Sequence, residues 1–95
     1  MHIVSIKRLK EFWTKHRDAE TPLRAWFRVA RTARWKNLAQ VRKVYPHADD
    51  VDGLTVFNIG GKKYPLIVKI QYKKGRIFVR QILTHSEYDK GGWKE

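Results

Sequence analysis

The stretch LTVFNIGGKKYPLIVKIQYKKGRIFVRQIL, residues 54–83, decides the fold, because its apolar residues recur with the short period of β-strands. Gly60-Gly61 is a turn dipeptide that adopts positive φ without steric cost, and Lys73-Lys74-Gly75 forms a second tight turn. The pattern between these turns predicts three strands, over residues 54–59, 64–72 and 76–83. Short turns between consecutive strands make the expected arrangement an antiparallel meander.

Two amphipathic helices are predicted before this stretch. The first follows Ser5, an acceptable N-cap, and its apolar face consists of Ile6, Leu9, Phe12, Trp13 and His16. The second begins at Thr21-Pro22, because a threonine cap satisfies an orphan N–H group and proline at the first helical position lacks one. Its apolar residues between positions 23 and 33 gather on one broad face, opposite Arg24, Arg28 and Arg31.

A short third helix is predicted to begin at Asn37, with Gln40 in a position like that of a capping box, and to end at Tyr45-Pro46. Residues 2–4 are compatible with a short opening strand. We therefore expect an α+β fold in one domain spanning residues 1–95. Two N-terminal helices and the short third helix should pack on one face of a small antiparallel β-sheet.

Alternation along the strands predicts which side chains face the helices. It assigns to the helix-facing side Leu66, Val68, Ile70, Tyr72, Ile77, Val79 and Leu83. It assigns to the open side Ile67, Lys69, Gln71, Arg76, Phe78, Arg80 and Ile82. Trp35 falls near the arginine stripe rather than with the core residues and is expected to be an exposed contact, whereas Trp93 could either close the core or meet a partner.

The chain is strongly basic. Its 21 Lys and Arg residues against nine Asp and Glu residues give a net charge of +12, of which residues 1–47 carry 12 − 3 = +9. Such a balance favours a polyanionic partner, with nucleic acid as the default. The stripe formed by Arg24, Arg28 and Arg31 is then a candidate for tracking a phosphate backbone, although it is also typical of a solvated helix face.

Composition excludes several classes of site. The absence of cysteine excludes disulfides, thiolate zinc sites and thiol nucleophiles. No apolar run approaches the ~18–20 residues of a membrane span, and no signal-peptide pattern opens the chain, so we expect a cytoplasmic protein without a membrane partner. Asp49-Asp50-Val51-Asp52-Gly53 has no Glu where a calcium loop would close, which favours an acidic turn. Gly60-Gly61-Lys62-Lys63 lacks the wider phosphate-binding motif and is better explained as a hairpin turn with two exposed lysines.

The segment Thr84-His85-Ser86-Glu87-Tyr88-Asp89 places an imidazole, a phenol and two carboxylates directly after the last strand. Histidine can take and give a proton near neutral pH, and a helical turn would bring His85 and Tyr88 to one face. Arginines on the preceding strand could hold a phosphate and stabilise the charge that develops on it. These residues meet the needs of phosphodiester cleavage, but the pattern alone favours a helix with a partly buried tyrosine and a surface histidine.

Several motifs together resemble the HigB family of RelE-like toxins from bacterial toxin–antitoxin systems. They are Leu9-Lys10-Glu11-Phe12-Trp13 with Lys15-His16, Ala25-Trp26, Ala48-Asp49, Val56-Phe57-Asn58-Ile59-Gly60-Gly61 and Leu83-Thr84-His85-Ser86-Glu87-Tyr88-Asp89-Lys90. The resemblance runs nearly end to end. It implies the same α+β fold and an mRNA interferase that cuts messenger RNA in the ribosomal A site.

The resemblance also implies a mechanism and partners. The ribose 2′-hydroxyl attacks the adjacent phosphate without a metal ion or other cofactor, and by matching position His85, Tyr88 and Arg80 are the catalytic candidates. The implied partners are mRNA, the ribosome and a helix-turn-helix antitoxin, through which the toxin reaches operator DNA only indirectly. Strand geometry and charge extend the expected RNA-binding set to Lys69, Lys73, Arg76, Lys62 and Lys63, together with the arginine stripe.

One departure from the family pattern is Pro65, where the family pattern has an arginine. Proline removes a basic side chain and a ladder N–H group, so it is expected at a sheet edge or at the first residue of a strand. Two alternatives to a nuclease remain open on the sequence: a non-catalytic RNA- or DNA-binding module, and a degenerate toxin that acts only through its antitoxin.

Overall fold

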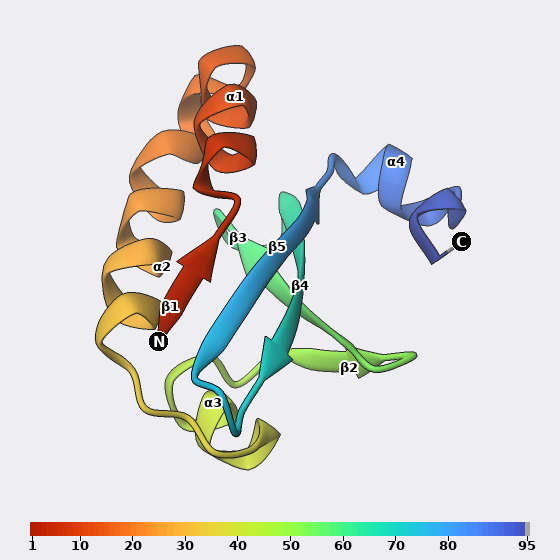
Figure 1. Ribbon diagram of the computed structural model, residues 1–95. Helices are drawn as coiled ribbons and strands as arrows, with labels where there is room; N and C mark the ends of the chain where they lie inside the picture. Colours follow the sequence, from red (N-terminus) through yellow and green to blue (C-terminus); the bar gives the residue numbers. More distant parts are fainter. Residues whose placement is uncertain (95) are drawn as a thin grey trace.

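The computed structural model describes residues 1–94 and has the predicted α+β architecture (Figure 1). Along this part of the chain the elements are β1 (His2–Val4), α1 (Ile6–Lys15), η1 (Arg17–Ala19), α2 (Glu20–Thr32), α3 (Leu38–Val44), β2 (Asp49–Val51), β3 (Leu54–Ile59), β4 (Tyr64–Gln71), β5 (Arg76–Ile82), α4 (His85–Asp89) and η2 (Gly92–Lys94). Helices α1 and α2 run in opposite directions beside the sheet, and α4 lies away from them, beyond the end of β5 (Figure 1). Among the helices of residues 1–94, none has the length and apolar character needed to cross a bilayer.

The strands within residues 1–94 form one sheet in the order β1-β5-β4-β3-β2. Strands β3, β4 and β5 are the predicted antiparallel meander. Strand β1 pairs with β5 in parallel, so the sheet is mixed rather than wholly antiparallel. Parallel neighbours need a long crossover, which the chain between β1 and β5 provides.

The edge strand β2 replaces most of the acidic turn predicted over residues 49–53. Asp49–Val51 pairs with β3, and the reversal is confined to Asp52 and Gly53, whose φ angles are 53° and 82°. A three-residue strand with two aspartates has no hydrophobic alternation that would identify it. Charge at a sheet edge also discourages pairing with another chain.

The helix starts differ from the predictions in two places. Helix α2 begins at Glu20 rather than at Thr21-Pro22, because the 3-10 turn η1 runs directly into it and the Glu20 N–H group donates to the Arg17 carbonyl. Ser5 precedes α1 as predicted, but its φ is 72° and its side chain makes no capping hydrogen bond. The start of α3 is confirmed, since Asn37 Oδ1 accepts from the Gln40 N–H group at 3.0 Å.

The main core lies between the sheet and helices α1, α2 and α3. Trp26 is fully buried, and its ring meets that of Phe57 edge-on at 5.4 Å. The prediction that Trp35 is exposed is wrong, because this side chain is 6% exposed and stacks on Phe57 at 6.2 Å. The error has a simple cause: α2 ends at Thr32, so a helical projection no longer describes where residue 35 points.

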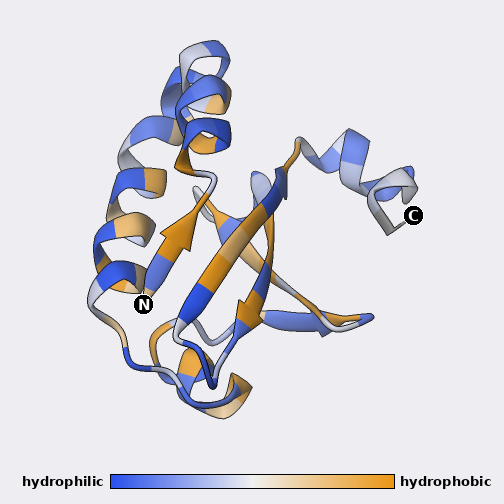
Figure 2. Cartoon of the chain, in the orientation of Figure 1, coloured by the Kyte–Doolittle hydropathy of each residue, from blue (hydrophilic) through white to orange (hydrophobic). Residues whose placement is uncertain are grey.

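A β-bulge at Arg80 changes the alternation along β5. Val79 pairs with Val68 and Gln81 pairs with Ile67, which leaves Arg80 as an extra residue without a partner on β4. Two predictions are therefore wrong: Ile82 belongs to the main core, and Leu83 packs with the second cluster on the other face. Strict alternation fails because one inserted residue reverses the direction of every side chain after it. Figure 2 shows hydrophobic residues along the middle of β5, with hydrophilic residues before and after them.

A second, smaller cluster covers part of the face that was expected to be open. Val56 and Ile67 pack there against Trp93, which is 7% exposed. Trp93 thus closes a core, one of the two alternatives for this residue. The segment that carries α4 is held against the sheet by this contact.

Pro65 also departs from expectation, since it is the second residue of β4 and is buried inside the sheet. Proline lacks a backbone donor but keeps its acceptor, and the Pro65 carbonyl accepts from the Leu83 N–H group at 3.0 Å. This hydrogen bond ties the end of β5 to the start of β4, close to where α4 begins.

Candidate functional site

Helix α4 positions the imidazole and the phenol that were predicted to act in catalysis. Its first turn is a capping box: Thr84 Oγ1 accepts from the Glu87 N–H group at 3.3 Å, and Glu87 Oε1 accepts from the Thr84 N–H group at 3.0 Å. The Thr84 N–H and hydroxyl groups lower the pKa of the Glu87 carboxyl, which stays ionised as the cap requires. On this short helix the ring centroids of His85 and Tyr88 lie 6.3 Å apart.

Tyr88 is half-buried against Trp93. The two rings stack with centroids 4.9 Å apart, and Trp93 Nε1–H donates to the Tyr88 carbonyl at 3.0 Å. Burial raises the pKa of the Tyr88 phenol, and the carboxylates of Asp49 and Asp89 raise it further. The phenol is therefore a proton donor at neutral pH, whereas the exposed imidazole of His85 is open to a substrate.

Arg80 supplies the last positive charge before α4 in the sequence. Its side chain is exposed, and none of the ion pairs formed within residues 1–94 uses it. Its backbone carbonyl, left without a β4 partner by the bulge, accepts from Arg8 Nη1 at 2.9 Å. Arg8 was not predicted as a site residue, because only the packing of α1 on β5 brings it here.

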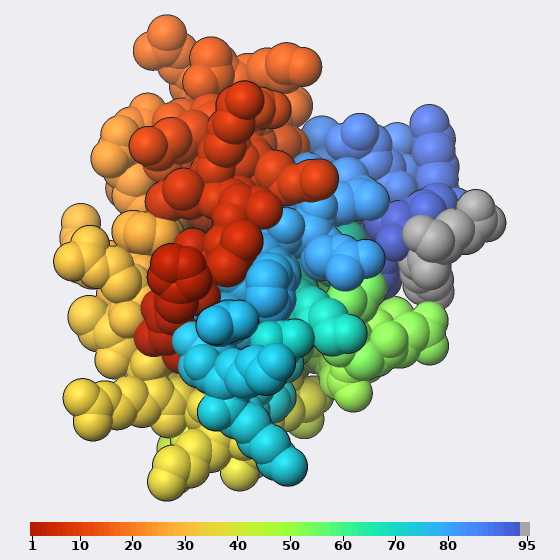
Figure 3. Space-filling model, in the orientation of Figure 1, coloured from red at the N-terminus to blue at the C-terminus, as the bar shows by residue number. Residues whose placement is uncertain are grey.

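A groove of about 560 Å³ separates α1 from the end of β5. It is lined by Arg8, Glu11, Phe12, Thr14, Lys15, Gln81, Ile82 and Leu83. The groove exists because β1 pairs with β5 only as far as Phe78, after which the edge of β5 faces α1. Figure 3 shows this face, with the red and orange side chains of α1 next to the blue side chains of β5 and the C-terminal segment. Its cationic rim and its place beside Thr84 suit a polyanion approaching His85.

The other predicted cations of the sheet lie toward the opposite end of β5. Lys69 pairs with Phe78 and Gln71 with Arg76, on the face that α1 and α2 do not cover. Lys73 is in the β4–β5 turn, which projects from the molecule far from the blue C-terminal segment (Figure 3). Lys69, Lys73 and Arg76 therefore do not surround His85, and they extend the positive charge along the sheet instead.

The two lysines of the β3–β4 turn differ from each other. Lys63 Nζ pairs with an Asp18 carboxylate oxygen, and Tyr64 donates its phenol hydrogen to the other oxygen at 2.7 Å. Both bonds lower the pKa of the Asp18 carboxyl, and the bond from Lys63 has the larger effect. Asp18 thus ties the hairpin to η1, which the sequence reasoning missed, while Lys62 is exposed and makes none of the ion pairs of residues 1–94.

The arginine stripe of α2 lies in the helical layer. Arg24, Arg28 and Arg31 are exposed, and Arg24 Nε donates to Glu20 Oε2 at 2.8 Å. The helices pack on the first face of the sheet, whereas Tyr88 packs with the cluster on the second face. The stripe and the α4 pair therefore belong to different sides of the molecule.

The acidic residues do not form a metal centre in the described part of the chain. Among residues 1–94, no three His, Asp or Glu side chains come close enough together to hold a metal ion. Asp49 and Asp50 belong to β2, and Asp52 is part of the turn that follows it.

Comparison with known proteins gives a consistent result. Residues 19–91 match the profile of a family described as HigB_toxin, the RelE-like toxic component of a toxin–antitoxin system. Among curated proteins, the mRNA interferase toxin HigB of Escherichia coli K12 is 27% identical over 92 residues, which cover 94% of this chain and 88% of that protein. The mRNA interferase HigB of Escherichia coli O6:H1 is 28% identical over 93 residues, covering 95% and 90% of the two chains.

Proposed function

The chain belongs to the HigB family of RelE-like toxic components of toxin–antitoxin systems, and we propose that it is a ribosome-dependent mRNA interferase acting in the cytoplasm. The observation that carries this proposal is the α4 pair: an exposed imidazole and a half-buried, protonated phenol 6.3 Å apart, beside a cationic groove. The relatives named mRNA interferases support the substrate class.

The proposed reaction is a transesterification. His85 accepts the proton of the ribose 2′-hydroxyl, and the 2′-oxygen attacks the adjacent phosphorus. The bond from phosphorus to the 5′-oxygen breaks, and Tyr88 gives its phenolic proton to that oxygen. The products are a 2′,3′-cyclic phosphate and a 5′-hydroxyl end. The raised pKa of Tyr88 keeps a proton on the phenol and so supports this division of roles.

Arg80 is proposed to hold the scissile phosphate and to stabilise the charge that builds on it. Its exposed guanidinium makes none of the ion pairs of residues 1–94, so no bond to a carboxylate has to break when the phosphate binds. The RNA backbone on either side of the scissile phosphate would be contacted by Lys62, Lys69, Lys73 and Arg76. Solvent and salt would screen each of these electrostatic contacts. No step in this mechanism is assigned to a metal ion.

Inducible expression tests the proposal, with His85→Ala as the variant and His47→Ala as its matched control, since both histidines are exposed. The unmutated chain and the His47 variant should arrest growth and leave 2′,3′-cyclic phosphate ends on cellular mRNA. The His85 variant should lose cleavage by ~10²–10⁴-fold, the usual contribution of a positioned acid or base. Unimpaired growth with the unmutated chain, or undiminished toxicity of His85→Ala, would contradict the proposal. Binding of ribosomes without cleavage would identify a non-catalytic RNA-binding module.

The partner proposed for control of this activity is a helix-turn-helix antitoxin that masks the toxin and represses the shared operon. Membership in a toxin–antitoxin family implies an antitoxin partner. The net charge of +12 favours an acidic one.

A further inference from the structure

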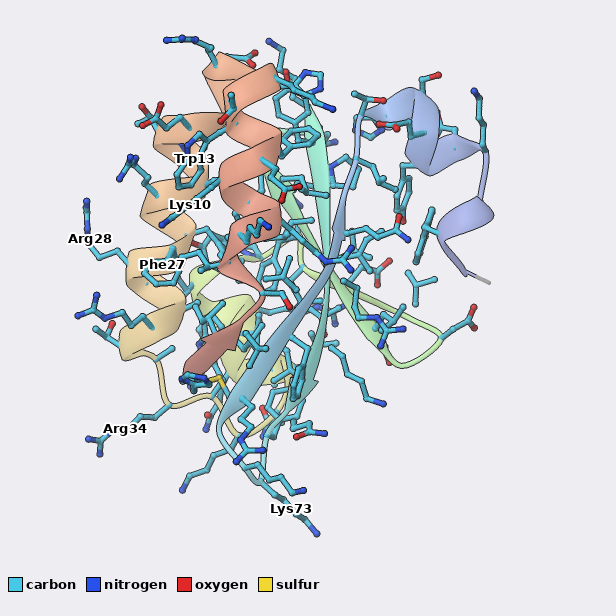
Figure 4. The ribbon with its side chains drawn as sticks, turned by 45° about the horizontal axis from the view of Figure 1, so that its top comes forward. Lys10, Trp13, Phe27, Arg28, Arg34 and Lys73 are labelled. Atoms are coloured by element: carbon cyan, nitrogen blue, oxygen red, sulfur yellow. The ribbon has the colours of Figure 1, made fainter. Side chains whose placement is uncertain are left out.

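A second groove lies between α1 and α2, outside the site described above. It has a volume of about 440 Å³, and all of its lining residues come from these two helices. Its apolar residues are Ile6, Trp13 and Phe27, each only partly buried. Figure 4 shows Lys10 and Trp13 of α1 beside Phe27 and Arg28 of α2, with Arg28 extending outward.

The rim of this groove carries only positive charge. Lys10, Arg24, Arg28 and Arg31 line it, and no carboxylate does. Glu20 neutralises part of this charge through its bond to Arg24. The remaining cations surround an apolar floor, in which Trp13 and Phe27 pack partly against the main core and leave the rest of their surfaces exposed side by side.

We propose that this α1–α2 groove is the docking site for an acidic amphipathic helix of the antitoxin. Two antiparallel helices leave a groove parallel to their axes, and the apolar face of a third helix fits such a groove. Apolar side chains of the partner would cover the exposed parts of Trp13 and Phe27, and carboxylates beside them would meet the three rim cations that Glu20 does not bind, which are Lys10, Arg28 and Arg31. This inference rests on the proposed protein antitoxin and not on the catalytic proposal.

The observations favour a protein helix over RNA. The Arg24 guanidinium lies 4.8 Å from the centre of the Trp13 ring and covers one of its faces, so that face cannot stack on a base. The floor of the groove offers apolar contact area, and the polar phosphate and ribose groups of RNA gain little from being buried against it. The groove also belongs to the helical layer, while α4 packs through the cluster on the other sheet face. An antitoxin helix bound here would leave His85 and Tyr88 uncovered, so the proposed masking of this pair would be the task of another part of the antitoxin.

Charge reversal at the rim tests the proposal. The probe is the protein encoded by the reading frame next to the toxin gene, titrated against the full-length toxin. The test variant is Lys10→Glu with Arg28→Glu, and the matched control is Lys36→Glu with Lys43→Glu, which makes the same change in net charge at exposed positions near α3. The test variant should bind the antitoxin at least about tenfold more weakly, and the control variant within about twofold of the parent.

A second variant, Phe27→Ala, removes an apolar contact without altering charge, and it should also weaken binding about tenfold while circular dichroism confirms that it is folded. Equal affinities for test and control variants, whether both unchanged or both reduced, would overturn the proposal. A test variant that keeps its antitoxin affinity but loses binding to 70S ribosomes would overturn it too, and would assign the groove to RNA.

Discussion

Replacement of Trp93 by alanine tests how the C-terminal segment holds Tyr88 in place. Trp93 is 7% exposed, packs with Val56 and Ile67, and stacks on Tyr88 at 4.9 Å. A buried tryptophan removes on the order of 200 Å² from water, which at ~25 cal/mol per Å² sets an upper limit of about 5 kcal/mol. The segment of α4 and η2 can shift to close part of the space, so we expect a loss of about 3 kcal/mol in the free energy of unfolding.

Urea unfolding followed by far-UV circular dichroism measures this loss. With a urea m-value of about 1–1.5 kcal/mol/M for a domain of this size, a 3 kcal/mol loss lowers the midpoint by about 2–3 M. Trp93→Phe keeps a ring against Tyr88 and should recover more than half of the loss. The same substitutions should lower mRNA cleavage in the same order, because Tyr88 loses its support.

Val44→Ala serves as the control, since Val44 is 51% exposed and its truncation should cost less than about 0.5 kcal/mol. A midpoint for Trp93→Ala within about 0.5 M of the parent would refute the reasoning. It would mean that the contact between Trp93 and the sheet contributes little to stability and that Tyr88 is held by other residues.

Three further outcomes are expected. Arg80→Ala should reduce mRNA cleavage more than Arg24→Ala, because only Arg80 is proposed to contact the reacting phosphate; equal losses in a translation-coupled cleavage assay would contradict this. Asp18→Asn should remove a stabilisation that the parent has above pH ~4 and loses as the pH falls through the lowered pKa of Asp18, so the difference in Tm between the two proteins should shrink from pH 7 to pH 2.5. Thr84→Ala should cost about 1 kcal/mol in urea unfolding through loss of the α4 cap, and a Thr84→Ser variant should keep most of that stability.

Local sequence patterns predicted most of the fold. The Gly60-Gly61 turn and the alternating apolar residues around it identified β3 and β4, because a turn dipeptide and a two-residue period act over short distances. Asn37 identified the start of α3 for the same reason, since the cap and the group it binds are three residues apart. The parallel pairing of β1 depends on a strand that is distant in sequence. Strand β2 pairs with the adjacent β3 across Asp52 and Gly53, but its two aspartates give no hydrophobic alternation that would mark it as a strand.

The candidate site was predictable in part. The spacing of His85 and Tyr88 indicated a shared helix, and their rings do lie close together. The groove beside them and the contribution of Arg8 come from the packing of α1 against β5, which alternation and helical period do not specify. The engagement of Lys63 by Asp18 is likewise a contact between residues 45 positions apart. The sequence analysis placed both Lys62 and Lys63 in the expected RNA-binding set, because a count of charges does not show that one of them is paired with Asp18.

Because Arg80 is the extra residue of a β-bulge, the number of residues in β5 matters for function. Arg80 is both the extra residue that turns Ile82 toward the core and the residue whose guanidinium is proposed to bind phosphate. A point substitution alters the second role alone. Deletion of residue 80 would remove the guanidinium but keep the side-chain directions, because Gln81 would still lie opposite Ile67 and Ile82 opposite Leu66 in a regular ladder. Mutational scans of this strand should therefore show that folding tolerates many replacements of residue 80, and also its loss, whereas mRNA cleavage tolerates neither.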